Sequence, residues 1–110
     1  MSRKKIILRP QAERDVNQAV DYYFGEGGFA LAGKWADAVE SALRHIGEHP
    51  GTGSPRYAVL LKIPGLRCWP VKRFPYLAFY IERETELDVW RVMHQARDIP
   101  TWLDDDADNG

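Results

Sequence analysis

Apolar residues in the first half of the chain recur at helical spacing. In residues 11–24 and again in 29–46 they fall every three or four positions, which is typical of helices that bury one face. Pro10 suits the first turn of the first helix, because its missing N–H has no partner to lose there. Three glycines separate the two segments: Gly25, Gly27 and Gly28. Since so short a connection makes the helices antiparallel, the pattern predicts a helical hairpin.

Short apolar segments on either side of this hairpin predict strands. The run Ile6–Leu8 comes first, and a cluster of turn-forming residues from His49 to Pro55 ends the helical half. Three segments rich in aromatic and β-branched residues follow: 66–74, 76–83 and 87–94. Residues 84–86 suit a hairpin turn between the last two, so we expect three adjacent antiparallel strands. Pro70 and Pro75 cannot donate to a strand ladder, which places the 66–74 strand at an edge or a bulge.

The last strand is apolar on both faces. Strict alternation places Leu87, Val89 and Met93 on one face and Trp90 and Val92 on the other. A strand of this kind is expected at the centre of its sheet. On the same alternation, Arg91 is a lone charge on the face of Val89 and Met93.

Together these elements predict an α+β fold in the order β-α-α-β-β-β, with the helical hairpin packed on a small antiparallel sheet. A length of 110 residues allows one domain, and 45% hydrophobic with 28% charged residues is ordinary globular composition. We assign residues 1–103 to this domain, ending in a short docking turn or helix. Residues 104–110 form an acidic tail that we expect to be disordered.

Composition also excludes several classes of protein. Cys68 is the single cysteine, so a disulfide framework or thiolate metal cluster is excluded, and we expect a reduced core residue. The basic N-terminus is followed by three apolar residues where a secretion signal needs seven or more. The longest apolar stretch, residues 74–81, is far below the ~20 residues of a membrane-spanning helix. A soluble cytoplasmic protein is therefore expected.

The net charge of −1 hides an uneven distribution. No acidic residue lies between Glu48 and Glu82, and five cations do: Arg56, Lys62, Arg67, Lys72 and Arg73. The last seven residues hold four aspartates, which account for −4, so the other residues together carry +3. The basic segment is suited to binding phosphates or an acidic partner. Alternatively, its charges are solvated and protect a strand edge from aggregation.

Candidate catalytic groups are few. His94 lies near Arg91 and Arg97 and suits either a general acid or base, or a hydrogen-bonded structural role. His45 and His49 are four residues apart, as metal ligands on one helix face can be, but no third ligand is in a clear position. We therefore expect no metal and no cofactor. The four tryptophans should be mostly core, with one or two in a groove where a partner docks.

Several segments, in order, resemble ParE-type toxins of the RelE/ParE toxin-antitoxin superfamily. They are LRPQAERD at 8–15, DYY at 21–23, PGLR at 64–67 leading to VKRFPY at 71–76, and WRVMHQARD at 90–98. The resemblance covers residues 5–103. It implies the fold described above, and a toxin held inactive by a ParD-like antitoxin in a hetero-oligomer.

The superfamily has two branches, and the resemblance implies a different target for each. The RelE-like branch cleaves mRNA at the ribosome with basic residues on the sheet and a tyrosine or a histidine–tyrosine pair near the C-terminus. The ParE-like branch inhibits DNA gyrase. This sequence has no tyrosine after Tyr80 and carries Trp102 in that region, and tryptophan cannot transfer a proton. A non-enzymatic gyrase inhibitor is therefore the favoured interpretation, in which five residues supply binding charge rather than chemistry: Arg67, Lys72, Arg73, Arg91 and His94.

Two alternatives stay open. His94 with Arg91 and Arg73 can form a reduced nuclease constellation, and the chain can be an interaction module without toxicity. No membrane contact or specific nucleic-acid binding is expected. For the antitoxin, we predict an acidic amphipathic segment lying across the hairpin and the sheet edge, because the basic strands and surplus aromatic residues need a cover.

Overall fold

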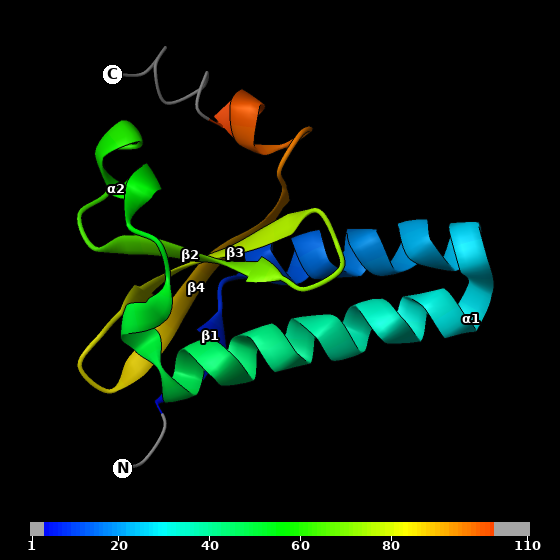
Figure 1. Cartoon of the computed structure of the whole chain (residues 1–110), viewed down its shortest axis with the longest axis horizontal. Helices are drawn as coiled ribbons and strands as arrows, with labels where there is room; N and C mark the ends of the chain where they lie inside the picture. Colours follow the sequence, from blue (N-terminus) through cyan, green and yellow to red (C-terminus); the bar gives the residue numbers. More distant parts are fainter. Residues whose placement is uncertain (1–3, 103–110) are drawn as a thin grey trace.

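A helical hairpin packs on one face of a four-stranded sheet (Figure 1). The computed structural model describes residues 4–102, so the predicted acidic tail, 104–110, lies outside the described residues. Both arms of the hairpin belong to α1, Pro10–Glu48, whose backbone leaves helical geometry at Gly27 and Gly28. Gly28 has a φ of 68°, a conformation that glycine adopts without steric cost. The predicted hairpin is confirmed, with the turn at these two glycines, while Gly25 remains helical.

The sheet contains β1 (Lys5–Leu8), β2 (Leu66–Val71), β3 (Tyr76–Glu82) and β4 (Glu86–His94) in the order β1-β4-β3-β2. As predicted, β2, β3 and β4 are antiparallel neighbours, and β4 is central. The proline-bearing β2 lies at one edge of the sheet and β1 lies at the other. The N-terminal strand pairs with β4 in parallel, so the complete sheet is mixed.

The predicted faces of β4 are wrong for its second half, because the strand contains a β-bulge. Phe79 pairs with Arg91 and Tyr80 pairs with Val89, so Trp90 is an extra residue. The alternation after it is therefore reversed. Val92 joins Leu87 and Val89 against the hairpin, and Met93 lies in the core of the other face, against which Trp90 also packs.

Each face of the sheet has its own core. The larger core lies under the hairpin and is built around the fully buried Trp35. The smaller core, on the opposite face, is covered by α2 (Arg56–Leu60) and by a helical turn at 99–102, where Trp102 meets Phe79 edge-on. The C-terminal docking turn was predicted. The short helix α2 was not, because five residues are too few for a helical period to show.

Cys68 is free and buried in the smaller core, as predicted. Burial raises the pKa of its thiol, so the thiol stays protonated near neutral pH. Of the four tryptophans, Trp35 is fully buried and the other three are half-buried.

Candidate functional site

The five predicted site residues lie in different settings. Lys72 and Arg73 occupy the turn between β2 and β3, and Arg67 lies further along β2. Arg91 and His94 lie on the second half of β4. The pairing of Tyr76 with both Val71 and His94 places the β2–β3 turn and His94 at the same end of the sheet.

Arg91 is held by a buried carboxylate. Its Nε and one terminal nitrogen donate to the two Asp15 oxygens at 2.8 and 3.0 Å, and Asp15 is only 8% exposed. The Val92 N–H donates to the same carboxylate at 2.9 Å. Because β1 ends opposite Val89, the outer edge of β4 is open beyond that point, and Asp15 caps it. The charge of Arg91 is thus neutralised within the fold.

His94 is engaged at the end of β4. Its Nδ1 accepts the backbone N–H groups of Ala96 at 3.1 Å and Arg97 at 3.2 Å, and its backbone N–H donates to the Asp98 carboxylate at 2.9 Å. Burial, and then the charge of Arg97, lower the pKa of His94 below 6.5. The ring is therefore neutral at pH 7, and Nδ1 is its accepting nitrogen.

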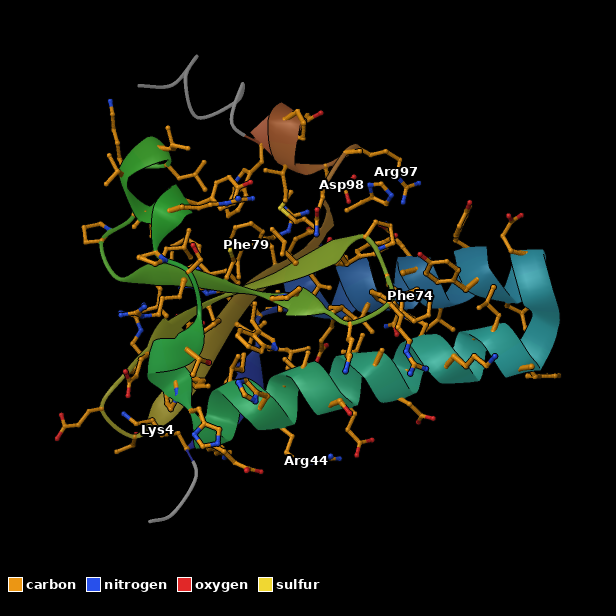
Figure 2. All side chains as sticks on the ribbon, viewed as in Figure 1. Lys4, Arg44, Phe74, Phe79, Arg97 and Asp98 are labelled. Atoms are coloured by element: carbon orange, nitrogen blue, oxygen red, sulfur yellow. The ribbon has the colours of Figure 1, made fainter. Side chains whose placement is uncertain are left out.

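A small pocket next to His94 brings Tyr22 and Tyr76, which the sequence did not suggest, together with Arg97, which it placed near His94. The Tyr76 hydroxyl accepts a hydrogen bond from Arg97 at 2.9 Å, and the Arg97 guanidinium lies over the Tyr22 ring. Figure 2 shows Arg97 and Asp98 side by side in the segment after β4. The pocket has a volume of about 140 Å³, and its wall also includes Asp15, Gln18, Ala19 and Val92. Burial raises the pKa of Tyr76, which is 4% exposed.

We call residues 49–81 the basic segment. Unlike Arg91, its cations are not paired with carboxylates of the described residues. Within residues 4–102, none of its five cations forms an ion pair. Arg67 donates to the Gly53 carbonyl oxygen at 2.7 Å, and the other four side chains are exposed. Lys62 and Arg73 also have φ values of 57° and 74°, and they are the two non-glycine residues with positive φ in the described chain.

A groove of about 510 Å³ lies between the β2–β3 turn and the second arm of α1. Leu31, Ala38 and Phe74 provide apolar lining. The charged lining consists of three cations and one carboxylate, so it is positive overall: Lys34, Lys72, Arg73 and Asp37. Figure 2 shows Phe74 between this turn and the hairpin, where its ring meets that of Trp35 edge-on. The groove therefore combines an apolar surface with positive charge.

The two histidines of α1 and its C-cap serve other contacts. His45 stacks on Trp69 with ring centroids 4.2 Å apart, its Nε2 lies 3.2 Å from the Thr52 hydroxyl, and its ring also meets that of His49. Residues 4–102 contain no cluster of three or more side chains suited to holding a metal ion. In the same residues, no helix is both long enough and apolar enough to cross a membrane.

Comparison with known protein families shows which family the chain belongs to. Residues 6–99 match the family described as "ParE toxin of type II toxin-antitoxin system, parDE". The chain belongs to the ParE toxin family. No curated protein sequence matches it.

A solved structure shares the ParE-like fold. It is described as "Chromosomal ParDE TA system from P. aeruginosa" and matches with a TM-score of 0.70 and 19% sequence identity. The alignment covers 83% of this chain and 95% of that one. This likeness supports the α+β fold of this ParE family member.

The predicted site of this ParE toxin combines residues of different kinds. Arg91 is hydrogen-bonded to Asp15, and His94 is hydrogen-bonded to the backbone of the turn that follows it. In contrast, the side chains of Lys72 and Arg73 are exposed. Asp15 and Tyr76 were missed as site residues, and Arg97 was placed near His94 but not among the five predicted residues. They come from three separate elements, and only the register of β3 with β4 could have indicated that Tyr76 lies beside His94.

Proposed function

We propose that this ParE family member binds DNA gyrase and blocks replication without catalysing a reaction, and that a ParD-like antitoxin neutralises it. The observation that carries the non-catalytic part is the state of His94. Its accepting nitrogen is occupied by two backbone N–H groups, and its lowered pKa leaves it neutral. A general base needs a free accepting atom, and a general acid needs a proton that it can release near neutral pH.

The arginines that a nuclease would need to bind phosphate are unevenly available. Arg91 donates two hydrogen bonds to Asp15, so its charge is already compensated. Arg73 is exposed and lines the groove on the hairpin side of the β2–β3 turn. This separation favours contact with a protein over cleavage of RNA.

The groove supports an antitoxin partner. An acidic amphipathic segment would place its apolar residues against Leu31, Ala38 and Phe74, and its carboxylates near Lys72 and Arg73. The similar solved structure is described as a ParDE system, which is in keeping with a partner of this kind.

One observation favours the second candidate, a ribosome-dependent mRNA endonuclease. Tyr76 and Arg97 lie beside His94, so β3 supplies the tyrosine that the C-terminal segment lacks. Against this, the Tyr76 hydroxyl is bound to Arg97, and its pKa is raised by burial. The charge and hydrogen bond of Arg97 lower this pKa, but burial is the larger influence, and the raised pKa reduces the capacity of Tyr76 for proton transfer at neutral pH.

Two assays with the purified chain test the proposal. We expect inhibition of gyrase supercoiling, equally by the wild type and by Tyr76→Phe, and no cleavage of mRNA on translating ribosomes. Undisturbed supercoiling together with mRNA cleavage that Tyr76→Phe abolishes would instead establish the endonuclease.

A further inference from the structure

The short helix α2 has one face anchored in the fold and one face exposed. Tyr57, Ala58 and Leu61 pack on the smaller core, and the Tyr57 ring meets Phe79 at a centroid distance of 5.3 Å. Val59 and Leu60 are 84% and 60% exposed. Two adjacent aliphatic side chains this exposed are unfavourable in water unless a partner covers them. The anchored face holds them in a fixed position.

Cations flank this apolar pair on both sides. Arg56 begins α2, and Lys62 follows it in the chain. Neither forms an ion pair within residues 4–102. The Arg56 guanidinium lies over the Tyr57 ring and donates to its hydroxyl at 2.8 Å, so its position is also fixed. The exposed face of α2 is therefore apolar at its centre and positive around it.

Lys62 occupies a position where glycine is the favoured residue. Its φ of 57° is left-handed, and the N–H of Ile63 bonds back to the Ala58 carbonyl oxygen at 2.9 Å. This is the usual end of a helix in which the residue after the cap is glycine, since a Cβ is strained there. The lysine is present despite this strain, and its ammonium forms no ion pair with the described residues that would explain it. A strained residue of this kind points to a role for its side chain outside the fold.

The position and shape of α2 indicate the kind of partner. In Figure 1, α2 projects from the sheet on the side away from the hairpin turn. The groove proposed for the antitoxin lies between α1 and the β2–β3 turn, so the two surfaces are separate. A projecting apolar pair is covered best by a concave site on a folded protein.

We infer that α2 and Lys62 form the surface by which the toxin holds its target protein, and that the target presents an apolar pocket rimmed by carboxylates. This inference rests on the proposed function in one respect: the toxin acts by binding a protein. It adds the contact surface and the chemistry of the complementary site. The apolar pair supplies the buried centre, and Arg56 and Lys62 pair with carboxylates at the rim.

The test compares a double variant, Val59→Asp with Leu60→Asp, with Phe29→Asp as a matched control. Phe29 is 85% exposed at the hairpin turn, so both variants place aspartate at exposed apolar sites. Growth arrest on induction and binding of the purified chain to gyrase are measured for each. We expect the double variant to lose growth arrest and to bind gyrase at least tenfold more weakly, with Phe29→Asp equal to wild type.

Lys62→Gly separates binding from folding. We expect its melting temperature to equal or exceed that of the wild type, while its affinity for gyrase falls severalfold. Full growth arrest by both the double variant and Lys62→Gly would overturn the inference, and so would an equal loss in Phe29→Asp. If the wild type fails to bind gyrase but the α2 variants alone lose growth arrest, the surface is supported and the proposed target is wrong.

Discussion

Arg91 and Lys62 are both cations of the sheet half of the molecule, but their surroundings are opposite. Arg91 donates two hydrogen bonds to a buried carboxylate that comes from α1, 76 residues away. Lys62 has no acidic partner among the described residues, and its backbone is strained. Removing a compensated charge should therefore cost stability, whereas removing an uncompensated one should cost binding.

Asp15→Asn should give the largest effect on stability. It leaves the Arg91 guanidinium without a counter-ion and weakens the cap on Val92, so we expect a loss of about 3 kcal/mol in the free energy of unfolding. Urea denaturation measures this loss. Arg44→Ala is the control, because its pair with Glu40 lies on the exposed helix surface and should contribute less than about 0.5 kcal/mol. An equal loss in the free energy of unfolding in the two variants would show that the buried pair contributes no more to stability than the exposed one.

Arg73→Glu should weaken binding to the proposed antitoxin about tenfold, or about 1.4 kcal/mol, with little change in stability. The remaining binding should be less sensitive to salt, because one attraction between opposite charges has been replaced by repulsion. Titration calorimetry at two salt concentrations measures both effects. Arg14→Glu, an exposed substitution on α1 outside the groove, is the control. An equal loss in this control would mean that net charge, and not the groove, determines the affinity.

Lys62→Gly and Arg73→Gly should each stabilise the fold by about 0.5–1 kcal/mol, because glycine relieves the strain of a left-handed backbone. Lys34→Gly is the matched control. Lys34 is exposed within α1, where glycine should cost up to about 1 kcal/mol. Thermal denaturation gives the sign in each case, and destabilisation by Lys62→Gly would mean that the lysine supports the fold.

The smallest effect concerns the pH dependence of stability. Because the fold lowers the pKa of His94 from 6.5, the unfolded chain binds more protons just below pH 6.5. The contribution of His94 should be complete above pH 6.5 and decline as the pH falls toward the lowered pKa. A hydrogen bond from Arg9 lowers the pKa of Asp88 from 3.8. Protonation of Asp88 therefore reduces the free energy of unfolding only below about pH 4, outside the range in which His94 titrates. Urea denaturation at several pH values should show a flatter dependence for His94→Asn than for the wild type, and identical slopes would contradict this account.

Much of the fold could be predicted from local pattern. The period of apolar residues indicated both arms of the hairpin, and the glycines indicated its turn. Pro70 in β2 and Pro75 in the following turn indicated an edge strand, and the apolar residues of β4 indicated its central place. Each of these features depends on residues close together in the sequence, where a side chain's preference for helix, strand or turn acts directly.

What the tertiary structure decided depends on contacts between distant residues. One extra residue at Trp90 reversed the faces of β4, because strand register is set by pairing with β3. The pair of Asp15 with Arg91 and the meeting of Tyr76, His94 and Arg97 depend in the same way on how elements pack. The sequence by itself determined which cations had no acidic neighbours along the chain. Only packing decided that Arg91 would pair with the carboxylate of Asp15, 76 residues away on α1, while the cations of the basic segment form no ion pair with the described residues.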